Sequence, residues 1–183
     1  MKIQIQHIPS QGLELAYGSE ARTFPVLKQL MDDGQCRFLE PIAVDLSVVS
    51  ERDLITIDGV LATRVELACS RCLELFQMPL RHRFTLRYSR EIPTDLHSGT
   101  GEPVALTAEQ IGLVYFKGEE IDFQDSIQEQ VVLALPFKPL CHEECQGLCP
   151  RCGADLNQGR CECGGVVIEN PFAVLKNRQW PEQ

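Results

Sequence analysis

The alternation of apolar and polar residues predicts a β-rich first half of the chain. Between residues 39 and 90 apolar side chains recur at every second position, which is the period of a half-buried strand. The clearest run covers residues 78–88, and residues 2–6 show a weaker alternation. We expect three or four antiparallel strands over residues 39–90, with a turn at Asp58-Gly59 and the sequence CSRC at the tip of the last hairpin.

Helical spacing of apolar residues predicts two short helices. The first lies near residues 23–33, with Thr23 as its cap, Pro25 close to its first position and Gly34 after its end. The second begins at a capping box of Ser126 and Glu129 and stops before Pro136.

Two smaller elements are expected elsewhere in the chain, one before the second helix and one near the C-terminal end of the sequence. The apolar residues 113–116 and 121–123 flank Gly118 and predict one small hairpin. The stretch NPFAVLKNRQW, residues 170–180, predicts a short terminal helix docked by Phe172 and Leu175.

These elements predict an α+β fold, built mainly from an antiparallel sheet or partial barrel with one or two short helices. We expect a β-rich domain over residues 1–136, in which the acidic segment 91–125 forms a partly flexible insertion. Residues 137–183 are expected to form a small cysteine-rich zinc module with a tail, because they hold too little apolar material for a hydrophobic core.

Composition agrees with a globular protein. The chain has 183 residues, of which 44% are hydrophobic and 23% are charged, and it is long enough to bury a core. It lacks a run of about 18 apolar residues, so we expect no transmembrane helix and no membrane partner. The first ten residues have no apolar core of a signal peptide, which predicts a cytoplasmic location. The net charge of −9 argues against a dedicated duplex-DNA binder.

Nine cysteines are the strongest chemical signal. Reducing conditions in the cytosol disfavour disulfides, and closely spaced pairs there are typical of metal ligands. Four thiolates around Zn²⁺ make a closed structural site, so eight cysteines predict two structural zinc ions and leave Cys36 over. The candidate ligands are Cys69, Cys72, Cys141, Cys145, Cys149, Cys152, Cys161 and Cys163.

The pairing of these cysteines is open at this stage. The favoured arrangement joins the pair 149/152 to 161/163, and the pair 69/72 to 141/145, because local pairs then share a metal. The pair 69/72 joined to 161/163, a cluster with bridging thiolates, an iron–sulfur cluster and a redox dithiol are the alternatives. His142 is a possible substitute ligand beside Cys141.

The pattern does not indicate an enzyme. Four thiolates leave a zinc ion no open coordination position, and the four histidines form no HExxH-like array. His82 lies on the apolar side of its strand and is expected in the core. No small-molecule substrate is expected.

Arginine residues gather around the last predicted hairpin. Residues 64–90 hold six arginines and two glutamates, a local charge of +4 in an acidic chain. Strand alternation places Arg81, Arg83 and Arg87 on one side, where they can contact RNA phosphates or form a solvated face that pairs with the acidic segment. The candidate RNA-binding residues are Arg64, Arg71, Arg81, Arg83, Arg87, Arg90, Arg151 and Arg160.

Several motifs in this order resemble the YceD family of bacterial and plastid large ribosomal RNA accumulation proteins. They are ACSRCLE, LALPFKPLC, GLCPRCG followed by LN, the pair CEC and the tail NPFAVL. The resemblance covers residues 40–176, and the family's motif cysteines correspond to Cys69, Cys72, Cys149 and Cys152.

The resemblance implies a role in accumulation or processing of large-subunit ribosomal RNA. We therefore expect a non-catalytic assembly factor that binds ribosomal RNA, a precursor of the large subunit or a ribosomal protein on it. The alternative is a zinc-ribbon adaptor that binds protein, or a chaperone of a basic ribosomal protein.

Overall fold

The fold is a curved sheet with two helices packed on one face. The computed structural model describes residues 1–52, 54–90 and 112–163. In the main sheet the strands follow the order β2 (Leu13–Ser19), β4 (Ile42–Glu51), β5 (Leu54–Ala68), β6 (Leu75–Ser89) and β7 (Leu113–Tyr115), and β3 (Cys36–Phe38) also pairs with β5. All pairings are antiparallel except that of β6 with β7. The α+β class is confirmed, and the described strands form no closed barrel.

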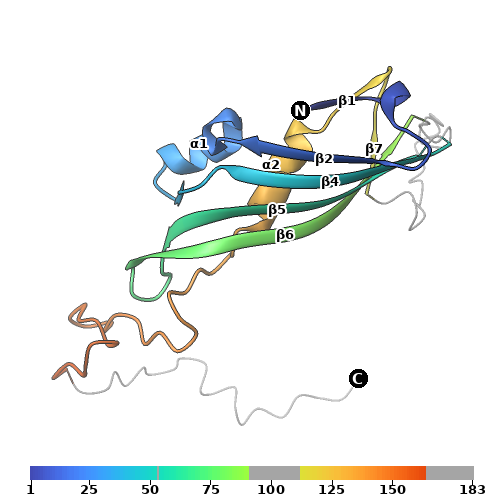
Figure 1. The fold of residues 1–183 in the computed structure, drawn as a ribbon. Helices are drawn as coiled ribbons and strands as arrows, with labels where there is room; N and C mark the ends of the chain where they lie inside the picture. The colour runs from blue at the N-terminus through green and yellow to red at the C-terminus, as the bar shows by residue number, and fades with distance from the viewer. Residues whose placement is uncertain (53, 91–111, 164–183) are drawn as a thin grey trace, which may run out of the picture.

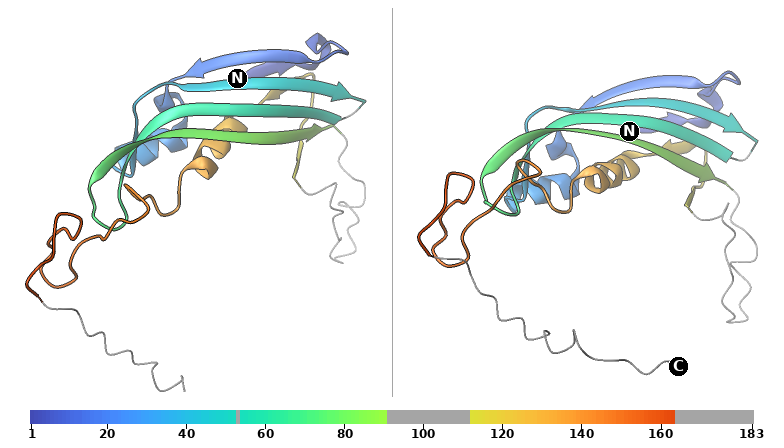
Figure 2. Two further views of the ribbon diagram at one scale, coloured as in Figure 1. Left: turned by 60° about the horizontal axis from the view of Figure 1, so that its bottom comes forward. Right: turned by 90° about the horizontal axis from the view of Figure 1, so that it is seen from below.

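The remaining elements lie beside this sheet. Figure 1 shows both helices on the same side of it, and Figure 2 shows how the sheet curves over them. A second, two-stranded sheet pairs the strand near the N-terminus with one that precedes the second helix. These elements are β1 (Lys2–Gln4), η1 (Ile5–His7), η2 (Ala21–Thr23), α1 (Pro25–Asp32), β8 (Glu120–Asp122) and α2 (Gln124–Ala134).

The hydrophobic core fills the space between the sheet and the helices. Strand alternation sends one set of side chains inward, and these pack on Leu27 of α1 and on Ile127 and Val131 of α2, all fully buried. The side-chain oxygen of Gln128 accepts a 2.8 Å hydrogen bond from the backbone N–H of Val26, which ties the two helices together. The opposite face of the sheet, here called the outer face, carries the exposed positions of each strand.

The predicted turn at Asp58-Gly59 is wrong. Both residues lie inside β5, which runs without interruption, and the chain instead turns before this strand, where Arg52 has a φ of 54°. Gly59 faces Phe84 across the β5–β6 pair, and the ring of Phe84 covers the space where a side chain would lie. The glycine therefore serves a close contact inside the sheet.

The helix boundaries also differ from the prediction. Phe24 precedes α1 as its N-cap, Pro25 opens the helix as expected, and the hydroxyl of Thr23 donates to the carbonyl of Glu20. Ser126 is no cap, because α2 begins at Gln124, and its hydroxyl accepts a 2.8 Å hydrogen bond from Tyr88 on β6. The need to satisfy a buried tyrosine hydroxyl here outweighs the local capping pattern.

The small hairpin predicted around Gly118 does not form. β7 pairs in parallel with β6, whereas β8 pairs with β1 at the other end of the sequence. The strand β2 was not predicted, although its residues alternate between half-buried and exposed.

Some expectations concern residues that the structure does not describe. The terminal helix at 170–180 and residues 91–111 of the acidic insertion lie outside the described residues. The division at residue 136 remains a prediction. No helix among the described residues is long and apolar enough to cross a membrane.

Candidate metal centres

The tip of the β5–β6 hairpin forms a compact turn around the pair Cys69 and Cys72. The backbone N–H of Arg71 lies 3.5 Å from the sulfur of Cys69. The N–H of Leu73 donates to the carbonyl of Cys69 at 2.9 Å, and Leu73 has a positive φ of 63°. This turn directs both sulfurs to the same side, as two ligands of one metal require.

The first cluster forms where this tip meets the segment after α2. The sulfur of Cys69 lies 3.7 Å from that of Cys145, and the sulfur of Cys72 lies 3.7 Å from that of Cys141. All four sulfurs lie within 4.8 Å of one another. Four sulfurs at about 2.3 Å from a zinc ion are separated by about 3.8 Å, so the spacing fits a tetrahedral site.

Hydrogen bonds and burial act against each other on the thiols of this first cluster. Burial raises the pKa of Cys69, but backbone N–H groups of Cys72 and Cys141 outweigh it and lower that pKa to about 6. Burial and the neighbouring sulfur of Cys145 raise the pKa of Cys141 to about 12. Cys69 therefore supplies a thiolate readily, whereas Cys141 needs a cation to stabilise its charge.

The second cluster repeats the turn of the first. The N–H of Arg151 lies 3.5 Å from the sulfur of Cys149, and the N–H of Gly153 donates to the carbonyl of Cys149 at 2.9 Å. Gly153 has a φ of 72°, close to that of Leu73 in the first turn. The four sulfurs, from Cys149, Cys152, Cys161 and Cys163, lie within 4.8 Å of one another.

The thiols of the second cluster show the same contrast. Backbone N–H groups of Cys152 and Arg151 lower the pKa of Cys149 to about 6. The adjacent sulfur of Cys152, with burial, raises the pKa of Cys163 to about 12. Both clusters can therefore bind a metal ion, and the grouping is the one that local spacing favours.

Arg71 fastens the hairpin tip to the cysteine-rich segment. Its guanidinium donates to the carbonyl of Cys145 at 2.7 Å and to that of Glu143 at 3.4 Å. Its own carbonyl accepts from Leu148, and Gly147 passes so close that an added Cβ would lie 3.0 Å from this oxygen. Arg71 therefore supports the first cluster from outside the ring of sulfurs.

Arg151 has the corresponding place in the second cluster, where its guanidinium donates to the carbonyl of Cys163 at 3.2 Å. Each turn thus carries an arginine that joins the two cysteine pairs of its own cluster. Sequence reasoning assigned both residues only to a candidate RNA surface.

Replacing Arg71 by alanine should lower the metal affinity of the first cluster by about tenfold, a typical effect of removing a partner that orients ligands. The second cluster should keep its affinity, since the substituted side chain makes no contact there among the described residues. Titration with Co²⁺ against a chelator measures both sites, with Arg22→Ala as the control. Unchanged affinity at the first cluster would contradict the supporting role.

Asn157 is a further residue of the first cluster that sequence reasoning missed. Its amide nitrogen lies 3.5 Å from the sulfur of Cys145, and its amide oxygen accepts a 2.7 Å hydrogen bond from the N–H of Gln146. The available signal was the Leu-Asn pair that follows the second Cys-x-x-Cys motif. Asn157 therefore connects the loop of the second cluster to the first.

Three other residues that the sequence analysis considered, Cys36, His142 and His82, are not among the eight sulfur ligands of the two clusters. Cys36 is buried in the main core, apart from both clusters. His142 lies beside the first cluster, with Nδ1 3.2 Å from the sulfur of Cys141, although four sulfurs already complete a tetrahedral set. His82 is half-buried and contacts the side-chain oxygen of Gln130 at 3.3 Å.

The other candidate arginines divide into paired and unpaired residues. Arg64 forms an ion pair with Glu40 at 3.1 Å, and Arg90 forms one with Glu119 at 3.4 Å. Arg160 is exposed next to the second cluster. Among the described residues no ion pair or hydrogen bond holds a further set of exposed arginines on the outer face of β6, namely Arg81, Arg83 and Arg87.

Several known proteins are similar to this chain in sequence. The model of a family described as "Large ribosomal RNA subunit accumulation protein YceD" matches residues 57–177. The large ribosomal RNA subunit accumulation protein YCED homolog 1, chloroplastic, of Arabidopsis thaliana is 26% identical over 154 residues, which cover 75% of this chain and 48% of that protein. The protein of the same name in Zea mays is 27% identical over 142 residues, which cover 67% and 48%.

A third relative is an uncharacterized protein of Mycobacterium tuberculosis, 31% identical over 126 residues that cover 64% of this chain and 56% of that protein. The chain spans about half the length of the curated relatives it matches. No solved structure matches it. The matched residues of the family model include most of β5, all of β6 and both cysteine clusters. The chain belongs to the YceD family of large ribosomal RNA subunit accumulation proteins.

Proposed function

We propose that both cysteine clusters hold structural zinc. The sulfur spacing of the first cluster fits a zinc tetrahedron, and the backbone N–H groups directed at Cys69 and Cys149 stabilise thiolates. Four thiolates close the coordination sphere and leave no position for a reacting water molecule. The metal would therefore shape the protein and take no part in a reaction.

The proposed role is a non-catalytic one in the accumulation of large-subunit ribosomal RNA. Family membership supports the process, because the family and the relatives in Arabidopsis thaliana and Zea mays carry that role in their names. The observation that supports direct RNA binding is the row of unpaired arginines on β6, formed by Arg81, Arg83 and Arg87 and here called the arginine row. Exposed guanidinium groups without carboxylate partners are free to bind phosphate.

Replacing the arginine row by alanine should release the protein from precursors of the large ribosomal subunit. Loss of three phosphate contacts should weaken binding by about tenfold or more and reduce its dependence on salt. Sedimentation of tagged protein through a sucrose gradient, at low and moderate salt and with or without RNase, measures this association.

The matched control removes the same charge elsewhere. Lys2, Arg22 and Lys28 lie on β1, η2 and α1, away from the outer face, and their replacement by alanine should leave sedimentation unchanged. If the arginine-row variant still sediments with the particle as the control does, direct RNA binding through this row is wrong.

A second candidate is a protein-binding adaptor for a basic ribosomal protein. The outer face supports it with three acidic residues on neighbouring strands, Glu14, Asp45 and Asp58. Association that survives RNase in the gradient would favour this candidate. The cytoplasmic location and the absence of a small-molecule substrate remain predictions.

A further inference from the structure

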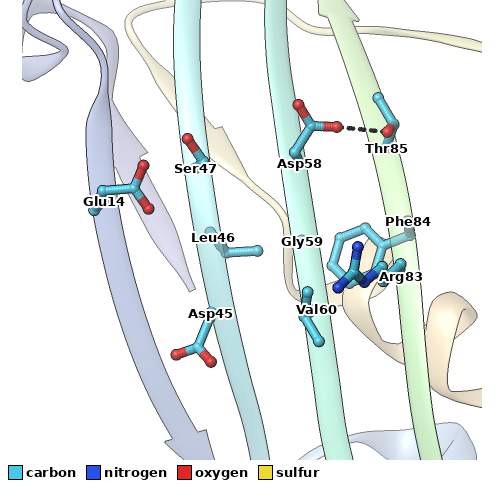
Figure 3. Close-up of a pocket in the computed structure, with 10 residues that line it drawn as sticks. All are labelled: Glu14, Asp45, Leu46, Ser47, Asp58, Gly59, Val60, Arg83, Phe84 and Thr85. Carbon is cyan, nitrogen blue, oxygen red and sulfur yellow. Dashed lines mark hydrogen bonds between the residues drawn. The ribbon is translucent and has the colours of Figure 1, made fainter.

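The outer face of the sheet is divided by charge. Figure 3 shows Glu14 on β2, Asp45 on β4 and Asp58 on β5, while Arg83 lies on β6 at the other side of the same pocket. The three residues of the arginine row all lie on β6. The acidic residues that line this pocket lie on β2, β4 and β5. A polyanion on this face is therefore attracted to β6 and repelled from β2 and β4.

Two members of the arginine row, Arg81 and Arg83, also lie on a free edge of the sheet. Only the last residues of β6, from Arg87 to Ser89, pair with β7, so residues 75–86 have a single partner strand within the described part of the chain. From Arg81 to Arg87 the row is about 20 Å long, at the usual rise of a strand. The row offers guanidinium groups to several phosphates, and the free edge beside Arg81 and Arg83 adds unpaired backbone N–H groups.

The outer face offers no surface for stacking bases. No aromatic side chain occupies an outward position of β2, β4, β5 or β6, and the aromatic residues of these strands point inward. Ala62 on β5 lies opposite Arg81 of the arginine row, and small residues also occupy outward positions of β2 and β4, namely Ala16, Gly18 and Ala43. Sheets that bind single-stranded RNA use aromatic stacking, whereas double-stranded RNA is recognised by its shape and its backbone.

From these observations we infer that the free edge of β6 binds the backbone of double-stranded RNA without reading its sequence. The arginine row contacts phosphates along the edge, and Asp58, Asp45 and Glu14 keep the duplex from lying across the sheet. This inference rests on the proposed RNA-binding function and adds the class of RNA and its orientation.

Fluorescence anisotropy of the zinc-loaded chain with labelled RNA tests the inference. The probes are a hairpin of about 20 base pairs, a second hairpin of scrambled sequence, and an unpaired strand of equal length. Both hairpins should bind equally and about tenfold more tightly than the unpaired strand. Replacing the arginine row by alanine should lower the slope of log affinity against log salt by about 3.

The outcomes separate this inference from the proposed function. Tighter binding of the unpaired strand, lost in the arginine-row variant, would overturn the inference and keep RNA binding. Strong preference for one hairpin sequence would also overturn it. Failure of all three probes to bind would overturn both.

A substitution at Asp58 tests independently whether the acidic residues of the outer face repel RNA. Figure 3 shows the 2.6 Å hydrogen bond that Asp58 accepts from Thr85. Thr85 lies between Arg83 and Arg87 along β6. The Asp58→Asn variant keeps an oxygen for this bond and removes a charge that repels phosphate. Its affinity for the hairpins should rise about two- to fivefold; an unchanged or lower affinity would overturn the proposed effect of the acidic strands.

Discussion

A Cys145→Ser variant is expected to bind one metal ion per chain in place of two and to lose the ordered contact between the hairpin tip and the segment after α2. Cys145 is 2% exposed, and its sulfur lies 3.7 Å from that of Cys69 across the cluster. Structural zinc contributes an apparent ~10–16 kcal/mol to folding, whereas a whole domain has a net stability of ~5–15 kcal/mol. Little apolar surface is present here to replace the metal.

Metal content by mass spectrometry and hydrogen exchange of residues 69–73 and 139–148 measure both effects. The Cys152→Ser variant should also lose one ion, but it should leave the hairpin tip protected, because all ligands of the second cluster come from residues 149–163. Cys36→Ala, outside both clusters, should retain two ions. A Cys145→Ser protein that keeps two ions and a protected tip would refute the assigned grouping, and bound iron would refute zinc.

A Gly59→Val substitution is expected to destabilise the sheet, although valine is a strong strand former. Any side chain at position 59 would overlap the ring of Phe84, which is itself buried in the core. Displacing this ring should lower the free energy of unfolding by about 2–3 kcal/mol. Urea denaturation followed by circular dichroism measures the change.

Gly18 on β2 is the matched control for this experiment. It occupies an outward position, and no atom lies within 4 Å of an added Cβ, so Gly18→Val should be neutral or stabilising. A double variant that combines Gly59→Val with Phe84→Leu should recover part of the lost stability, since the smaller side chain leaves room. Equal stability of the two glycine variants would show that the ring contact does not matter.

The long elements could be predicted from the sequence because a local pattern determines them. β6 alternates from Phe76 to Tyr88, and the buried residues Ile127 and Val131 of α2 lie four positions apart, as on one helix face. The Asp58-Gly59 turn was wrong because the reason for the glycine is a ring on another strand, which no local pattern reveals. The strands β7 and β8 failed as a hairpin because their partners are distant in sequence.

The candidate metal centres could also be predicted only as far as local sequence spacing determines them. The Cys-x-x-Cys turns and their capacity to bind metal could be predicted from spacing alone, and local spacing favoured the grouping that the structure has. The structural roles of Arg71 and Asn157 could not be predicted from the sequence. Each side chain contacts an atom of Cys145, which only the folded chain brings near: the carbonyl oxygen for Arg71 and the sulfur for Asn157. An arginine in an exposed turn looks the same in sequence whether it binds RNA or an internal carbonyl.

The first cluster also closes a large loop of the chain. It joins Cys72 to Cys141 across 69 positions, and the connection between β6 and β7 lies inside that loop. The entropy cost of closing a flexible loop grows only with the logarithm of its length, so doubling the length costs about 0.6 kcal/mol. Metal coordination at the hairpin tip thus closes this long loop at an entropy cost only slightly above that of a loop half its length.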